Sequence, residues 1–173
     1  RLVTLIGDII RLSQLDEGDA MPMEQVDLLA LAREAAADLQ KAAEEKHITL
    51  TVAGQSAQVR GVRRLLYEVV CNLCDNAIKY NVDGGSVTVT VGSEGNRAFI
   101  SVADTGIGIA PEHQDRIFER FYRVDKSHSK ASGGTGLGLS IVKHAVQYHH
   151  GEIELHSEEG RGTTIRIWLP EEN

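Results

Sequence analysis

The sequence predicts an α/β protein in which about three helices pack on a mixed, mostly antiparallel sheet, preceded by a short N-terminal helix. Apolar residues recur with helical spacing in three long segments of the domain and at alternate positions in four or five shorter ones. Most of the alternating segments follow one another across short turns, and strict alternation of strand and helix is absent. This pattern favours a two-layer α/β sandwich and disfavours a doubly wound fold.

The helices are predicted from their apolar periodicity and from the residues at their ends. Residues 2–15 place Leu and Ile on one face of a helix that is too short to be stable alone, so this face must pack on the domain, on a second copy or on a partner helix. Asp27 is a candidate N-cap, and Pro111 suits the first turn of a helix. The other predicted helices cover residues 27–46, about 62–80, 111 to about 120, and about 137–149.

Alternating apolar and polar residues predict the strands, and polar or glycine-rich segments predict the connections. A Ser-Glu-Gly-Asn segment joins two of the strands as a hairpin. Residues 16–22 have the composition of a linker, and residues 124–134 that of a Gly/Ser-rich loop. The predicted strands cover residues 47–52, 86–92, 97–104, 152–158 and 163–170.

Composition and charge narrow the classes of function. The net charge is −7 and no cluster of Lys and Arg occurs, which disfavours a nucleic-acid-binding protein. No apolar segment approaches the ~20 residues that span a bilayer, so we expect no direct membrane contact from these residues. Cys71 and Cys74 form a C-x-x-C pair within a helical pattern, without a second Cys or His pair, so we expect reduced helix thiols and not a zinc or redox site.

Three segments can carry chemistry, and the first is residues 72–80. Asn72 and Asn76 are four residues apart on a helix and share one face, with Lys79 beside that face one turn further on. Two amide oxygens and an ammonium can hold Mg²⁺ and the phosphates that it bridges. A solvated polar face is an equally good interpretation of these residues taken alone.

The second segment, residues 103–110, ends an apolar strand at Asp104 and continues into a glycine-rich turn. A carboxylate at a strand end can accept a hydrogen bond from an exocyclic amine such as that of adenine. Gly106 and Gly108 would let the backbone approach a planar ligand closely. Two other interpretations stay open, because D-T-G is also an aspartic-protease signature and a simple hairpin turn needs no ligand.

The third segment, residues 133–140, is glycine-rich and opens a helix, whose N-terminal N–H groups and dipole suit phosphate. Its spacing is neither the G-x-G-x-x-G of dinucleotide-binding folds nor the G-K-[ST] of P-loops, and a flexible loop with an N-cap is the alternative. Taken in order along the chain, the three segments suit one nucleotide, with Mg²⁺ and phosphates at one end and adenine at the other.

These segments resemble the sequence boxes of the sensor histidine kinase catalytic domain, a branch of the Bergerat-fold ATPases. The N, G1, F and G2 boxes of that family resemble NLCDNAIKYN (72–81), DTGIGIA (104–110), FERFYR (118–123) and GGTGLGLSIVKH (133–144). Residues 5–19 are similar to the end of the second helix of the family's dimerisation hairpin. The resemblance implies that residues 1–22 are the end of that hairpin plus a linker, and that residues 23–173 are the ATP-binding catalytic domain.

The resemblance also implies the residues of an ATP and Mg²⁺ site. Asn72 and Asn76 would hold Mg²⁺, and Asp104 would accept the adenine amine. Asn72, Lys79 and Arg123 would be the catalytic residues. The implied nucleotide-binding residues are Asn72, Asn76, Lys79, Tyr80, Asp104, Gly106, Gly108, Ile109, Tyr122, Arg123, Gly134, Gly136, Leu137, Gly138 and Thr163.

Two differences from related ATPases shape the expected activity. Gyrase-type and heat-shock-chaperone ATPases have a water-activating Glu where this sequence has Asn72, so the site suits transfer of the γ-phosphoryl group better than hydrolysis. None of the seven histidines lies in the family's phospho-acceptor context, so we expect the acceptor on a missing hairpin and no self-phosphorylation by this chain. The alternative is a nucleotide-binding regulatory module without phosphotransfer.

The resemblance further implies partners and a location. The partners would be the dimerisation hairpin that carries the acceptor histidine and a response regulator. The parent protein would be a homodimer anchored in the cell membrane, with these residues in the cytoplasm.

Overall fold

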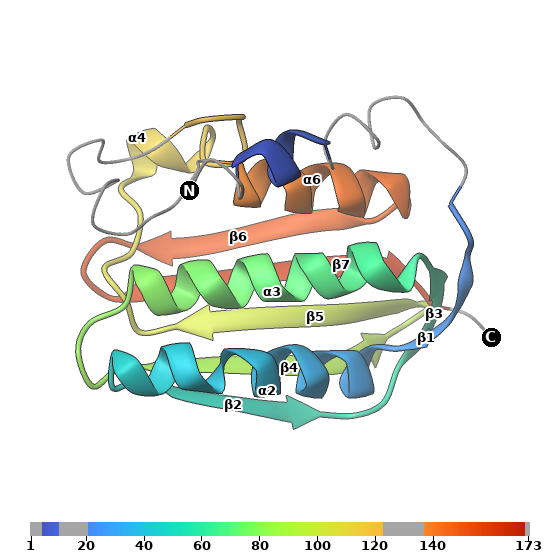
Figure 1. The fold of residues 1–173 in the computed structure, drawn as a ribbon, viewed down its shortest axis with the longest axis horizontal. Helices are drawn as coiled ribbons and strands as arrows, with labels where there is room; N and C mark the ends of the chain where they lie inside the picture. The colour runs from blue at the N-terminus through green and yellow to red at the C-terminus, as the bar shows by residue number, and fades with distance from the viewer. Residues whose placement is uncertain (1–4, 11–20, 123–136, 172–173) are drawn as a thin grey trace.

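The computed structural model describes residues 5–10, 21–122 and 137–171, and within them helices cover one face of a five-stranded sheet (Figure 1). The strand order is β2-β4-β5-β7-β6, with β2 parallel to β4 and the other neighbours antiparallel. The predicted two-layer α/β sandwich with a mixed, mostly antiparallel sheet is therefore confirmed. The strands are β2 (Thr49–Gly54), β4 (Ser86–Glu94), β5 (Arg97–Asp104), β6 (Glu152–Glu158) and β7 (Gly162–Pro170).

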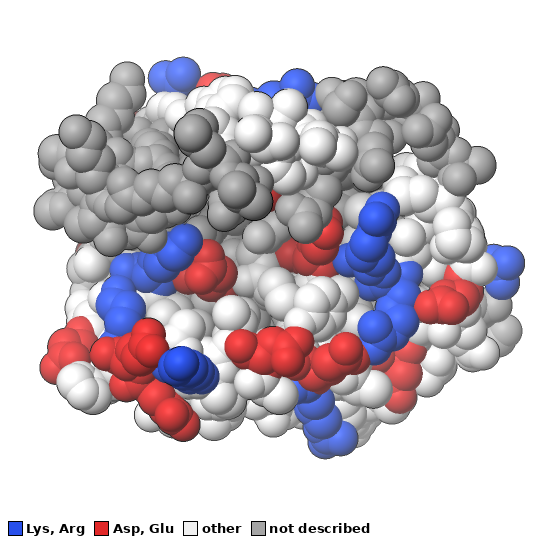
Figure 2. Space-filling view, in the orientation of Figure 1, with Lys and Arg blue, Asp and Glu red and all other residues white. Residues whose placement is uncertain are grey.

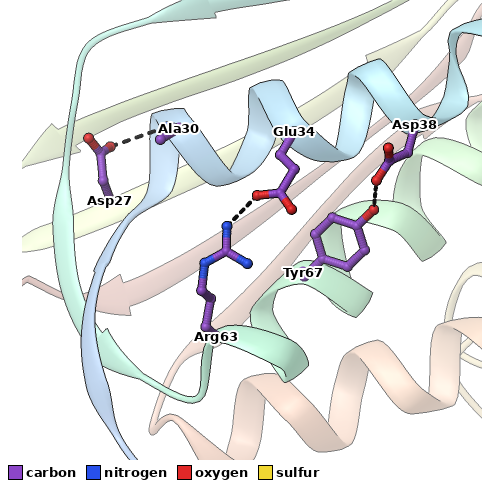
Figure 3. Close-up of polar contacts among 6 residues, drawn as sticks. All are labelled: Asp27, Ala30, Glu34, Asp38, Arg63 and Tyr67. Atoms are coloured by element: carbon purple, nitrogen blue, oxygen red, sulfur yellow. Dashed lines mark hydrogen bonds and ion pairs between the residues drawn. The ribbon is translucent and has the colours of Figure 1, made fainter.

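Three long helices lie over the sheet: α2 (Leu28–Glu45), α3 (Arg63–Lys79) and α6 (Gly138–Tyr148). Asp27 Oδ1 accepts the N–H of Leu29 at 3.0 Å and of Ala30 at 3.3 Å, so the predicted N-cap of α2 is confirmed (Figure 3). Two polar contacts then join α3 to α2, Arg63 to Glu34 and Tyr67 to Asp38 (Figure 3). Acidic and basic side chains are interspersed over these two helices (Figure 2).

The hydrophobic core lies between the helices and the sheet. In β4, Val87, Val89 and Val91 are buried at alternate positions, which is the period expected of a strand with one face covered. The apolar stripe of α3 faces them and includes Val69 and Leu73. Each fully buried side chain of this size contributes about 1.5–3 kcal/mol. Helix α3 lies along the middle of the sheet, and its buried residues, from Leu65 to Ile78, anchor it there over most of its length (Figure 1).

Two short strands were not predicted from the sequence. β1 (Glu24–Asp27) and β3 (Gln58–Gly61) form a separate antiparallel pair that places Val26 and Val59 in the core. Each strand has four residues with a single large apolar side chain, which is too short for alternation to be recognised.

Two predicted boundaries were wrong. The first strand begins at Thr49 and not at residue 47, because His47 has a φ of 59° and turns the chain after α2. The helix that starts at Pro111, α4 (Pro111–Gln114), ends well before residue 120. Beyond it, i→i−3 hydrogen bonds of 3.0 Å from Arg116 to His113 and from Glu119 to Arg116 hold a series of tight turns.

The N-terminal helix is described only over residues 5–10, where Figure 1 places it beside α6. Its Leu5 packs against the buried Leu137 and Ile141, so this part of the predicted apolar face contacts the domain. The side chains of Ile6, Ile9 and Ile10 are about half exposed. Among the described residues, no helix is both long and apolar enough to cross a bilayer.

Candidate functional site

A polar stripe on α3 contains the first group of predicted site residues. The helix is continuous through Asn72, Asn76 and Lys79, and all three are half-buried. The Nζ atom of Lys79 lies 2.8 Å from Oδ2 of Asp75 on the same helix. Asp75 was not predicted, although its i, i+4 spacing from Lys79 is a recognisable sequence signal. The stripe therefore offers two amides, an ammonium and a carboxylate along about two turns of helix.

The first turn of α6 contacts this stripe. A Cβ atom added at Gly138 would lie 3.8 Å from Cγ and Oδ1 of Asn72. Within the part of the chain that the structure describes, no side chain caps the N-terminus of α6, and its first turn holds no acidic residue. Leu137, immediately before the helix, is fully buried, and its carbonyl accepts the Ser140 hydroxyl at 2.8 Å. The structure thus brings the N-terminal end of α6, whose dipole attracts anions, against the amide of Asn72.

Asp104 ends β5 opposite Thr163 of β7. Its Oδ1 accepts the N–H of Gly106 at 2.9 Å and of Thr163 at 3.1 Å, and the described contacts leave Oδ2 open. Burial raises the pKa of Asp104 above its usual range, and the two N–H donors act in the opposite direction. A half-buried carboxylate with one oxygen available is suited to accept a hydrogen bond from a ligand.

The turn after Asp104 packs against the end of α3. The N–H of Ile107 donates to the carbonyl of Tyr80 at 3.0 Å. A Cβ at Gly106 would lie 2.4 Å from that carbonyl oxygen, and Gly108 combines a φ of 72° with a Cβ position 2.1 Å from the Glu158 carbonyl oxygen. Both positions therefore require glycine because of contacts with the chain's own backbone. Close approach to a ligand, the reason predicted from the sequence, is not needed to explain them. The ring of Tyr80 remains 44% exposed beside this turn.

A pocket of about 470 Å³ lies at this end of the sheet, and Asp104 and Thr163 are among its lining residues. Ser157 and Gln114, also in the lining, were not predicted. The Ser157 hydroxyl accepts the N–H of Ile109 at 2.8 Å and lies 2.8 Å from the Thr163 hydroxyl. Gln114 Nε2 donates to the carbonyls of Ile109 at 2.9 Å and of Ser157 at 3.2 Å. No sequence motif marks either residue, because their role depends on the contacts that α4 and β6 make with the segment around Ile109.

The remaining predicted site residues lie beyond α4 or outside the described residues. Tyr122 is hydrogen-bonded through its hydroxyl to Nδ1 of His113, and the Arg116 guanidinium carbon lies 4.6 Å from the centre of its ring. Arg123, Gly134 and Gly136 lie outside the described residues.

The two cysteines are both free. Burial raises the pKa of Cys74 to about 12 and also raises the pKa of Cys71. Thiols with raised pKa values are poor nucleophiles and poor metal ligands. No three His, Cys, Asp or Glu side chains group as a metal site in residues 5–10, 21–122 and 137–171.

Comparison with known proteins places this chain in a family. The family described as histidine kinase-, DNA gyrase B-, and HSP90-like ATPase matches residues 61–173. The sensor-like histidine kinase SenX3 of Mycolicibacterium smegmatis is 42% identical over 173 residues, which are 99% of this chain and 45% of that protein. The sensor histidine kinase RppB of Synechocystis is 40% identical, over 98% of this chain and 38% of that protein. The chain thus spans less than half the length of these curated relatives.

Solved structures give the same result. The mycobacterial sensor histidine kinase MprB superimposes with a TM-score of 0.74 at 31% identity, over 87% of this chain and 98% of that one. Full-length ShkA in complex with AMPPNP superimposes with a TM-score of 0.85 at 30% identity, over 98% of this chain and 36% of that one. These matches give no support to an aspartic-protease role for Asp104. The chain belongs to the histidine kinase-, DNA gyrase B- and HSP90-like ATPase family, as the catalytic, ATP-binding domain of a sensor histidine kinase.

Proposed function

We propose that this domain binds ATP with Mg²⁺ and positions the γ-phosphoryl group for transfer to a histidine on a separate helical hairpin. One observation carries the proposal. Helix α3 contacts the N-terminus of α6 through Asn72 and the Asp104 turn through Tyr80. A single helix therefore joins a place suited to phosphate and metal to a place suited to a purine amine.

At the phosphate end, the chain's own residues would bind and orient the triphosphate. The N–H groups at the start of α6, around Leu137 and Gly138, would donate to phosphate oxygens. Lys79 would exchange part of its ion pair with Asp75 for a phosphate contact, since its side chain is 28% exposed and reachable from the stripe. Arg123, Gly134 and Gly136 belong to this proposal through the family resemblance alone.

The metal fits the donor set of the stripe. Amide oxygens are hard ligands of the kind that Mg²⁺ accepts, and Asn72 and Asn76 supply two of them on one helix face. The bound ion would neutralise charge on the phosphates. Asn72 also stands where related ATPases have a water-activating Glu, which favours transfer to another nucleophile over hydrolysis.

At the base end, the open Oδ2 of Asp104 would accept the adenine amine. Tyr80, Gly106, Gly108, Ile109, Tyr122 and Thr163 would line the remainder of the nucleotide. Ser157 and Gln114 support the lining, because they fix Ile109 and the Thr163 hydroxyl in place.

The wider protein follows from the same proposal. Residues 1–22 would be the end of the dimerisation hairpin plus a linker, and residues 23–173 the catalytic domain. The partners would be the hairpin with its acceptor histidine and a response regulator, in a homodimeric parent anchored in the membrane with this domain in the cytoplasm. ShkA, which matches 98% of this chain, is recorded in complex with AMPPNP, and this supports the nucleotide part of the proposal.

The first test is the substitution Asn76→Ala, which removes one amide while keeping a good helix former. We expect calorimetry to show that Mg²⁺-dependent ATP affinity falls at least ~10-fold, because one metal ligand is lost. Asn96→Ala, at an exposed turn, is the matched control and should bind as the wild type does. Wild-type affinity in Asn76→Ala would count against the assignment.

A second experiment separates kinase from regulatory module. A separately produced dimerisation hairpin with its histidine is mixed with this domain and γ-labelled ATP. Label on the hairpin supports the kinase. ATP binding without transfer to any hairpin would identify the chain as a nucleotide-binding regulatory module instead.

A further inference from the structure

Asn81, the last residue of the segment that resembles the N box, is a buried polar residue to which neither the resemblance nor the comparisons assign a role. Its side chain is only 9% exposed and lies at the end of α3. Oδ1 accepts the N–H of Val82 at 2.8 Å and the hydroxyl of Thr105 at 3.2 Å. Nδ2 donates to the carbonyl of Ser86 at 3.0 Å. A buried amide with both its oxygen and its nitrogen engaged is ordered and costly to disturb.

These contacts join the ends of three elements, of which the third is distant in sequence from the other two. Asn81 follows α3, Ser86 begins β4, and Thr105 follows β5 next to Asp104. Thr105 closes the network, because its hydroxyl accepts the N–H of Ser86 at 2.9 Å while donating to Asn81. The side chain of Asn81 therefore links the helix of the amide stripe to the turn of Asp104, in addition to the backbone bond from Ile107 to Tyr80.

The packing around the network leaves little freedom. A Cβ added at Gly85 would lie 2.3 Å from Oδ1 of Asn81 and 2.7 Å from the Thr105 hydroxyl. On the other side, Gly106 packs against the Tyr80 carbonyl and the Asn81 Cα, at 2.4 Å and 3.0 Å from an added Cβ. The position of the turn after Asp104 is therefore determined by the groups that contact it on both sides. Asn81, at the end of α3, is one of these groups.

We infer that Asn81 is a positioning residue for recognition of the nucleotide base. It acts through Thr105 and sets where the carboxylate of Asp104 stands relative to α3. The inference rests on the proposed function, since it concerns the base end of that same site. Loss of the link would misplace Asp104 and lower the preference for a base that carries an amine.

The test compares ATP with ITP, which has a carbonyl oxygen where adenine has its amine. Affinities for both nucleotides are measured by calorimetry with Mg²⁺ present, for the wild type, Asn81→Ala, Thr105→Val and Thr105→Ser. The ratio of the two affinities is the readout, because general loss of folded protein lowers both affinities alike and leaves the ratio unchanged. Thr105→Val removes only a hydroxyl and keeps the side-chain shape, so it serves if Asn81→Ala does not fold.

We expect the wild type to prefer ATP. Asn81→Ala and Thr105→Val should each weaken ATP binding by about tenfold and bring the two affinities together, since both variants lose the hydrogen bond between Thr105 and Asn81. Thr105→Ser keeps the hydroxyl and should keep the preference. Asn96→Ala is the control for an asparagine that contacts no part of the network.

The outcomes distinguish this inference from the proposed function. A wild type that binds neither nucleotide contradicts the proposed function, and the inference fails with it. A wild type that prefers ATP, with the preference intact in both Asn81→Ala and Thr105→Val, contradicts the inference alone. Equal wild-type affinities for ATP and ITP would also overturn the inference, because Asp104 would then not select the amine.

Discussion

The two ends of helix α3 hold buried polar groups that are used in opposite ways. At the N-terminal end, His149 is 5% exposed, its Nε2 accepts the N–H of Val62 at 2.9 Å, and its Nδ1 donates to the Ala145 carbonyl at 2.7 Å. Both ring nitrogens are thus bonded within the protein. At the C-terminal end, Asp104 has one oxygen bonded and, among the described contacts, one left open.

This difference separates a structural polar group from a binding group. Burying a polar atom costs free energy unless a partner replaces water. For His149 the protein supplies every partner, so the cost is offset within the fold. For Asp104 part of the cost remains until a ligand donates to the open oxygen. Sites of this kind reduce stability in the absence of ligand and recover it on binding.

The largest expected effect is at the structural end. His149→Ala removes the acceptor of the Val62 N–H and leaves a cavity beside Gly61, so we expect a loss of about 2–4 kcal/mol in the free energy of unfolding. Urea denaturation measures it. His156→Ala is the matched control, because the His156 side chain is 74% exposed, and it should change stability by less than ~0.5 kcal/mol. Equal effects of the two substitutions would break the comparison.

A smaller effect is expected at the binding end. Asp104→Asn keeps an oxygen for the two N–H donors but replaces the open carboxylate oxygen, so ATP affinity should fall by ~10- to 100-fold. The free energy of unfolding, in contrast, should increase slightly in this variant at neutral pH. Burial raises the pKa of Asp104, so its favourable contribution is complete below the unfolded pKa and is lost as pH rises through the folded pKa.

The paired readouts for Asp104→Asn are calorimetry with ATP and thermal unfolding at neutral pH. The variant should unfold at a slightly higher temperature than the wild type while binding ATP more weakly. A variant that both unfolds at a lower temperature and keeps its ATP affinity would show that Asp104 is structural, as His149 is.

The smallest expected effect is a pH dependence of the contribution that His149 makes to the free energy of unfolding. Burial lowers the pKa of His149, the neighbouring His150 acts in the same direction, and the bond to the Ala145 carbonyl opposes them. A lowered folded pKa means that the stability is complete above the unfolded value of about 6.5 and is lost as pH falls through the folded value. The stability gap between wild type and His149→Ala should therefore narrow on acidification, as followed by urea denaturation from pH 7.5 to 5. A gap that stays constant would show that His149 does not titrate differently in the folded state.

The sequence predicted the elements that carry strong local signals. The predicted helix over residues 62–80 and the predicted strand over residues 97–104 match α3 and β5 to within one residue, because apolar periodicity and turn residues agree there. The same periodicity placed Asn72 and Asn76 on one helix face. Family resemblance, and not periodicity, supplied the roles of Asp104 and the glycines.

What the sequence did not predict depends on contacts between distant residues. The β1–β3 pair has too few apolar residues for a strand pattern to be recognised. Helix α4 was expected to continue, because the turns with i→i−3 hydrogen bonds that follow it have ordinary helical composition. Ser157 and Gln114 lie in no motif, and Asn81 ends the segment that resembles the N box without a role implied for it. The contacts of all three residues are made to segments that the local sequence pattern does not reveal. For His149, no local pattern reveals that its ring reaches Val62, immediately before α3.

The β1–β3 pair also determines how a mechanical force on the preceding residues is transmitted to the domain. β1 continues directly into α2, while its four residues pair with β3, which ends two residues ahead of α3. Tension applied at Met23 is therefore divided between two helices, one attached covalently and the other through ladder hydrogen bonds. The segment that precedes β1 is in this way attached to the domain at two points, through α2 and through β3.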